Sequence, residues 1–350
     1  MLGIDARAAR YTLTAALTLL LLCLVYTIRT TLFVFILALL FAYLLSPLVN
    51  VIDRFLPGKG KHTPALSIAY IIFIAALFAA VTQIGSRVIE QANLLAKSMP
   101  ALLQRFEQPM PGDSLKAQVM QKIQQQVARG SGDLFALLPQ AGSRALALAG
   151  NLIDVIIIPI LGFFFLKDGG EIRVHFLALI DDESRRARVD DILADIDVLL
   201  AQFMRAVVLL SLATFVSYSI FFSILRVPFS ILLAAVAASL EFIPMIGPLT
   251  AGAVILIVIA VNGGPVLGAL AFLAVYRLFQ DYILSPQLMR AGMKLHPLLV
   301  LFGVFAGAEL SGIPGAFLSV PVLALIRIVY LRLRNRRTAL VSPKVPAGHP

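Results

Sequence analysis

Long apolar segments alternate with short polar ones along most of the chain, and their lengths predict helices that cross a membrane. A spanning helix needs about 20 mostly apolar residues. Segments of roughly that length lie at 11–28, 32–52, 65–84, 146–166, 206–225 and 266–284. Two more, at 228–261 and 296–330, are longer, and each is broken in the middle. The pattern therefore predicts an all-α, polytopic helical membrane protein with eight hydrophobic segments, about six of them full spans.

Each broken segment combines an acidic residue with a proline and a glycine. The first break reads EFIPMIGP at 241–248, and the second reads ELSGIPG at 309–315. Proline removes a backbone donor and glycine tolerates unusual dihedral angles, so both helices should be interrupted there. The flanking halves, about 12–16 residues each, reach only ~18–24 Å and are too short to cross the ~30 Å hydrocarbon core. Each segment is therefore either one kinked span or a re-entrant hairpin.

The distribution of basic residues helps to choose between these two forms. If Arg7 and Arg10 are cytoplasmic, the arginines at 332–337 are cytoplasmic as well. Two re-entrant hairpins would also put Arg290 and Lys294 on that side, which fits the positive-inside rule better than two kinked spans. The charges thus favour hairpins that enter from opposite faces, as in transporters built from inverted repeats, where loosened backbone meets near the midplane. Both termini are predicted to be cytoplasmic.

Two polar segments interrupt the apolar pattern and define the expected units. Residues 85–145 are rich in glutamine and basic side chains, with apolar residues at helical spacing, which predicts amphipathic helices on the membrane surface or against a partner. Residues 167–205 carry four aspartates largely off an apolar face, which predicts a solvated helix docked on the bundle. The expected units are a three-span bundle (1–84), the amphipathic insert (85–145), a transport core (146–330) that includes 167–205, and a basic disordered tail (331–350).

Composition excludes a soluble protein. Residues of the set AVILMFWYC make up 60% of the chain and charged residues only 14%, and the mean hydropathy is +0.93. So few charges cannot cover the surface of a water-soluble fold. The net charge of +10 comes from side chains that mostly lie at the ends of apolar segments, so it predicts contact with lipid headgroups and no nucleic-acid partner.

Signatures of enzymes and of metal sites are absent from the sequence. It contains no phosphate-binding GxxxxGK[ST] motif, and its four histidines form no HExxH motif. Ser311-Gly312 is similar to the serine motif of intramembrane proteases, but it lacks the preceding glycine and a histidine on another span. One cysteine, Cys23, allows no disulfide within the chain. We therefore expect no catalytic residue, no metal site and no cofactor.

Three acidic residues inside apolar segments are the strongest candidates for a functional role. A carboxylate in a bilayer costs about 2.5 kcal/mol or more, and such residues usually line pathways. Glu241 and Glu309 both precede a break, where each could serve the transport pathway, cap the following half-helix, or do both. Asp281 lies four residues after Arg277, so it is either half of a helix-surface ion pair or part of a pathway.

Four motifs in the second half resemble those of the autoinducer-2 exporter family (AI-2E), also described as PurR-regulated permease-like proteins. They are FFFLKDG at 163–169, EFIPMIGP at 241–248, DYILSP at 281–286, and HP at 296–297 with Gly307, Gly312, Gly315 and Pro321 after it. Their order and spacing cover about residues 150–330. The resemblance implies a homo-oligomeric, multi-pass permease of the bacterial inner membrane.

The function that the resemblance implies is export of a small polar solute such as a signalling molecule. Other members are described as sodium/proton antiporters, so H⁺ and Na⁺ are candidate coupling ions, and a non-transporting membrane scaffold is the alternative from another class. The implied pathway residues are Glu241, Pro244, Gly247, Pro248, Asp281, Ser285, Pro286, Glu309, Gly312 and Gly315.

Overall fold

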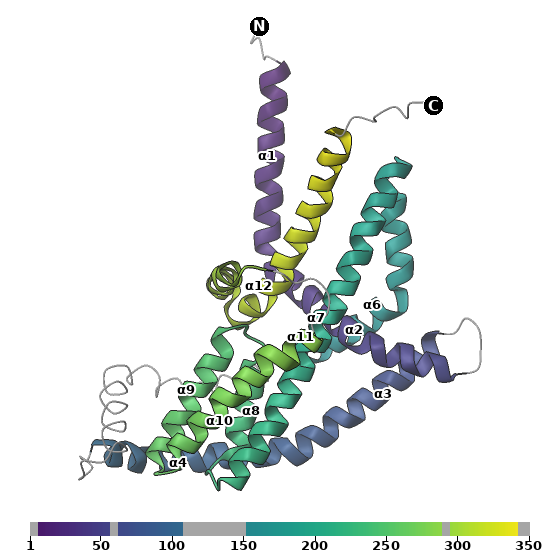
Figure 1. Cartoon of the computed structure of the whole chain (residues 1–350). Coiled ribbons are helices and arrows are strands. Elements are labelled where there is room, and N and C mark those ends of the chain that lie inside the picture. Colours follow the sequence, from purple (N-terminus) through teal and green to yellow (C-terminus); the bar gives the residue numbers. More distant parts are fainter. Residues whose placement is uncertain (1–5, 57–61, 108–151, 289–294, 342–350) are drawn as a thin grey trace, which may run out of the picture.

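The computed structural model describes residues 6–56, 62–107, 152–288 and 295–341 (Figure 1). Within these ranges every regular element is a helix. Six of the helices are long and apolar enough to cross a membrane. The prediction of an all-α polytopic membrane protein is therefore confirmed. The six include the second broken segment but not the helix at 152–178, whose predicted span begins outside the described residues.

The N-terminal helices pack on a later part of the chain. Helix α1 (Ala6–Thr27) extends away from the body (Figure 1), and its described side chains are exposed. Helices α2 (Arg29–Phe55) and α3 (His62–Ala80) share a small core with α6 (Leu152–Ala178), where the Tyr70 hydroxyl donates to the carbonyl oxygen of Pro159 at 3.1 Å. The expected unit 1–84 thus contributes two helices to a core completed by α6.

A π-helical turn, η1 (Val81–Gly85), joins α3 to the amphipathic helix α4 (Ser86–Glu107). Helix α4 lies across the lower ends of the two helices at 230–240 and 246–261 (Figure 1). Its Leu95 is buried in the largest core cluster, and the side-chain oxygen of Gln91 accepts the backbone N–H of Leu232 at 2.9 Å. The start of the predicted insert is therefore an amphipathic helix; residues 108–145 lie outside the described part of the chain.

Helix α7 (Glu183–Ile224) is 42 residues long. The sequence predicted a docked amphipathic segment at 167–205 followed by a separate span at 206–225. Instead, residues 167–178 belong to α6, and the rest of the polar segment from Glu183 continues into the span as one helix. At its start, Asp182 accepts the backbone N–H of Arg185 at 3.0 Å, and this hydrogen bond holds the pKa of Asp182 below its ordinary value.

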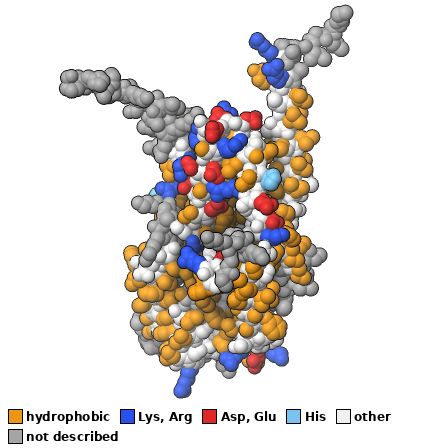
Figure 2. All heavy atoms as spheres, turned by 90° about the vertical axis from the view of Figure 1, so that its right-hand side faces the viewer, with side chains coloured by type: hydrophobic (Ala, Val, Ile, Leu, Met, Phe, Trp, Pro, Cys, Tyr) orange, Lys and Arg blue, Asp and Glu red, His pale blue; other side chains and the backbone are white. Residues whose placement is uncertain are grey.

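The aspartates on the polar half of α7 are held by arginines from two other helices. The Arg173 guanidinium of α6 lies 2.7 Å from Asp190 and 2.9 Å from Asp197, and that of Arg332 lies 2.6 Å from Asp195. Figure 2 views the molecule from the right-hand side of Figure 1. It shows charged side chains gathered in the upper part of the molecule, above a broad apolar belt. The predicted solvated face of this segment therefore also forms ion pairs.

The first broken segment folds into a helical hairpin. Helices α8 (Ser230–Leu240) and α9 (Ile246–Val261) contribute to the same buried core and are joined by the turn 241–245. The turn is tight: a Cβ atom on Gly247 would lie 1.8 Å from the carbonyl oxygen of Leu240, so only glycine fits there.

The second broken segment also reverses direction. Helix α12 (Pro297–Val341) is interrupted at Ser311 and Gly312, where Gly312 has φ 64° and ψ −147°. Backbone atoms of Gly307 and Gly315 lie so close that a Cβ atom on either residue would come within 2.3 Å of the other's carbonyl oxygen. Residues eight apart in one straight helix are about 12 Å apart along its axis, so the two arms must fold against each other. Both breaks thus form hairpins; the membrane face from which each enters stays a prediction.

Aromatic rings of α7 and α10 (Val266–Phe279) lie in the same buried core as the first hairpin. Tyr218 and Phe222 of α7 pack against Phe272 and Tyr276 of α10, with ring centroids 5.1–5.7 Å apart. Helix α10 continues through a second π-helical turn, η2 (Gln280–Leu284), into α11 (Ser285–Leu288). The packing holds the turn 241–245 close to η2.

Candidate functional site

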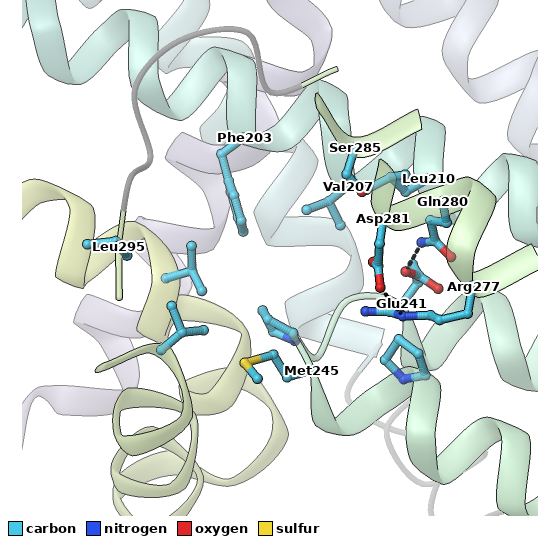
Figure 3. Close-up of a pocket in the computed structure, with 14 residues that line it drawn as sticks. Phe203, Val207, Leu210, Glu241, Met245, Arg277, Gln280, Asp281, Ser285 and Leu295 are labelled. Atoms are coloured by element: carbon cyan, nitrogen blue, oxygen red, sulfur yellow. Dashed lines mark hydrogen bonds and ion pairs between the residues drawn. The ribbon is translucent and has the colours of Figure 1, made fainter. Parts of the chain in front are cut away.

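A cavity of about 220 Å³ lies where the turn of the first hairpin meets α7, η2 and α12 (Figure 3). The described residues that line it are Phe203, Val207, Leu210, Glu241, Pro244, Met245, Pro248, Arg277, Gln280, Asp281, Ser285, Leu295, Val300 and Val320. Phe317 of α12 contacts both Phe203 and Phe242, with ring centroids 5.7 and 5.8 Å away, and so joins the second hairpin to this site.

The carboxylate of Glu241 is held by neutral donors from two helices. The hydroxyl of Thr214 donates to Oε2 at 3.3 Å, and the amide of Gln280 donates to Oε1. Thr214 is 1% exposed and Gln280 is 3% exposed, so these hydrogen bonds are shielded from water. Neutral donors lower the cost of burying a carboxylate without cancelling its charge.

Behind Thr214 the hydrogen-bond chain continues to Tyr276, whose hydroxyl oxygen lies 3.1 Å from Oγ1 of Thr214. A threonine hydroxyl has one hydrogen, which Thr214 donates to Glu241. Tyr276 must therefore be the donor to Thr214, and the chain of donors points toward the carboxylate. If Glu241 took up a proton, both hydroxyls could turn round and the chain would keep its bonds.

Arg277 and Asp281 form an ion pair at the same wall of the cavity, with Nε and Oδ2 2.9 Å apart. Their side chains are 40% and 44% exposed, so the pair faces open space. Asp281 lies in the π-helical turn η2, a deviation that is often found at functional sites. The two sequence interpretations of Asp281 are thus compatible, because it is paired with Arg277 and also lines the cavity.

The structure brings together half of the pathway residues that the sequence predicted. Glu241, Pro244, Pro248, Asp281 and Ser285 line the cavity. The other five predicted residues are not among its described lining residues: Gly247, Pro286, Glu309, Gly312 and Gly315.

The second break is away from the cavity. Glu309 is exposed near the tip of the second hairpin, next to Leu310, which is 79% exposed. The expectation that both breaks would meet at one site therefore does not hold for the cavity found in the described residues, where α12 contributes Val300 and Val320 instead. A role for Glu309 in the pathway stays a prediction.

Sequence reasoning missed the buried partners of Glu241. Thr214 and Tyr276 lie in segments that the sequence predicts only as apolar spans, and Gln280 immediately precedes the predicted pathway residue Asp281. The available signal was a polar side chain inside an apolar helix, which usually needs a hydrogen-bond partner. Within the described residues, no group of three or more His, Cys, Asp or Glu side chains could hold a metal ion.

Apolar helices of spanning length, a broken helix and a carboxylate in a cavity at the break together define a transporter-like membrane protein. The family model described as "AI-2E family transporter" matches residues 15–335, and the chain belongs to this family. The resemblance inferred from the motifs is thereby confirmed over nearly the whole chain.

Relatives from two bacterial species support the same class. The "Putative transport protein YrrI" of Bacillus subtilis is 25% identical over 328 residues, which cover 89% of each chain. The "Putative transport protein YueF" of the same species is 23% identical over 338 residues, 90% of each chain. The "Putative transport protein MT0215" of Mycobacterium tuberculosis is 27% identical over 306 residues, 82% of this chain and 79% of the relative. The chain is therefore a multi-pass membrane protein of a transporter family.

Proposed function

We propose that this protein is a secondary transporter that exports a small polar solute across the bacterial inner membrane, and that the solute binds in the cavity at Glu241. The observation that carries the proposal is the position of this carboxylate, at a helix break, inside a cavity and held by neutral donors. Backbone groups freed at a break are tolerated at membrane depth only beside protein or water. A polar solute can use both the carboxylate and these groups.

The test is solute flux into proteoliposomes that contain the purified chain, screened with labelled small polar solutes. Glu241→Gln should reduce flux at least tenfold while the protein still folds and inserts, because the amide has a similar size but no charge. Glu171→Gln is the matched control, since Glu171 is exposed on α6 and does not line the cavity. Wild-type flux in Glu241→Gln would remove this residue from the mechanism. Absence of flux through the wild-type chain for every solute tested would leave a non-transporting scaffold as the better hypothesis. The same assay on Glu309→Gln tests the role predicted for Glu309.

A second candidate function is sodium/proton antiport. It is favoured by Glu241, which has no arginine, lysine or histidine within ion-pair distance among the described residues and could hold a proton and a cation in turn. Vesicles loaded with a pH-sensitive dye separate the two candidates. Proton movement that requires sodium supports the antiporter, and its absence supports transport of an organic solute.

The proposed orientation places both termini in the cytoplasm. It is supported by the positive-inside rule, and the polar half of the long helix α7 lies at the same end of the molecule as the start of α1 and the end of α12 (Figure 1). Cysteines introduced at 263 and 290, labelled from either side of the membrane, test the sidedness of the hairpins. We further propose a homo-oligomer, which cross-linking in the native membrane would detect.

A further inference from the structure

The cavity at Glu241 has one polar wall and one apolar wall. In Figure 3, Arg277, Gln280 and Asp281 gather around Glu241 on one side, and Phe203 and Leu295 lie across the cavity from them. The apolar side comes from α7 and α12, and includes Val207, Val300 and Val320. A solute that is polar all round would find hydrogen-bond partners on one side only, and its other side would lose water without replacement. The two walls therefore fit a molecule with a polar head and an apolar body.

The polar wall carries an excess of one negative charge among the described lining residues. Glu241, Arg277 and Asp281 are the charged members of that set. The Arg277–Asp281 pair, 2.9 Å apart, cancels within itself. Glu241 accepts hydrogen bonds from the neutral groups of Gln280 and Thr214. Arg277 attracts both carboxylates, so the three charges together leave one negative charge without a counterion. In apolar surroundings an uncompensated carboxylate attracts a cation much more strongly than it would in water.

The volume of the cavity sets the size of the part of an occupant that it can enclose. A water molecule takes up about 30 Å³ in the liquid, and methylene and ammonium groups are of similar size. A cavity of about 220 Å³ therefore has room for roughly seven such groups. A bare metal cation would leave most of this volume and the whole apolar wall unused.

We infer that the occupant is a small amphipathic organic cation, with an ammonium-type head at Glu241 and an apolar body of about five or six carbons against α7 and α12. The inference rests on the proposed transport function and names the substrate class for the same site. Asp281, half exposed toward the cavity, is the second carboxylate within reach of the head group.

The test is binding of radiolabelled n-hexylamine, which is protonated at neutral pH, to the full chain in phosphatidylcholine nanodiscs. Unlabelled primary amines of three to ten carbons compete, alongside alcohols and carboxylates of the same lengths. Each methylene should strengthen competition about fourfold until the cavity is filled near six carbons, and longer chains should then compete less well. An alcohol should compete at least tenfold less well than the amine of equal length, and a carboxylate should not compete.

Two variants separate the walls. Glu241→Gln should remove the preference for amine over alcohol and keep the optimum of chain length, whereas Val300→Thr should weaken the gain per methylene and keep the preference for amines. The matched controls, Glu171→Gln on α6 and Val322→Thr on the exposed side of α12, should change neither. Non-specific partition of the amines into the nanodisc lipid would rise with every added methylene and would not change in these variants. It is therefore distinguished from binding in the cavity.

Three outcomes overturn the inference: competition that rises without an optimum, equal competition by amines and alcohols, or preference for carboxylates. If one of these is found while solute flux still depends on Glu241, the substrate class is wrong and the transport function stands. If flux is also independent of Glu241, the proposed binding of the solute in the cavity at Glu241 fails as well.

Discussion

The contact between Gly307 and Gly315 is the feature that makes α12 a hairpin, and replacing Gly307 by alanine tests it directly. A Cβ atom at position 307 would lie 2.3 Å from the carbonyl oxygen of Gly315 and 2.7 Å from its carbon, whereas ordinary contacts begin near 3.4 Å. The two arms would therefore have to part by about 1 Å, a gap that already forfeits a good part of the dispersion energy between them.

The expected cost of Gly307→Ala is about 1–3 kcal/mol of folding stability, as for other overpacked sites. The neighbouring atoms are backbone and not the end of a flexible side chain, so the strain cannot be relieved by a change of rotamer. We expect the midpoint of thermal unfolding in detergent to fall by several degrees, measured as loss of the monodisperse peak in size-exclusion chromatography after heating.

Gly170→Ala provides the control, because a Cβ atom there meets nothing within 4 Å. This substitution in a helix should leave the midpoint unchanged or raise it slightly, since alanine favours helix over glycine by about 1 kcal/mol. If Gly307→Ala and Gly170→Ala unfold at the same temperature, the two arms of α12 are not in backbone contact. The segment would then be a kinked span, and the hairpin would be refuted.

Three smaller perturbations test the surroundings of the site. Thr214→Val removes a hydroxyl that donates to Glu241 and should cut solute flux about fivefold or more, because a buried acceptor loses its partner. Thr214→Ser keeps the hydroxyl and should retain flux. Equal flux in both variants would exclude a role for the hydrogen bond. Gln91→Ala removes the acceptor of the Leu232 N–H at the start of α8. Hydrogen exchange of that amide should speed up about fivefold, as for loss of a helix cap. Unchanged exchange would contradict the contact between α4 and α8. Arg173→Ala should lower the free energy of unfolding by about 1 kcal/mol or less, because the ion pairs of Arg173 are partly exposed. The loss of stability measured in low salt should become smaller in high salt. A loss that does not depend on salt concentration would show that the pairs do not act through charge.

The boundary inside α7 shows where sequence reasoning failed. The change from a charged segment to an apolar one near residue 205 was interpreted as the junction of two elements. No proline or glycine lies between residues 183 and 224, so nothing in the local chemistry stops the helix. The change in polarity marks a change of surroundings along one helix, from ion pairs with Arg173 to the apolar core.

The number of apolar segments, their helical nature and the two interruptions follow from the sequence alone, because segment length, proline and glycine act locally on the backbone. Tertiary structure decided which polar groups meet. Thr214 and Gln280 are far apart in the chain, and both donate to the carboxylate of Glu241 only because the first hairpin packs between α7 and η2. It also separated the two acidic breaks: Glu241 lines the cavity, while Glu309 is exposed near the tip of the second hairpin, which contributes Val300 and Val320 to the cavity. Such pairings depend on the packing of distant segments, and the pattern along a single segment carries no record of them.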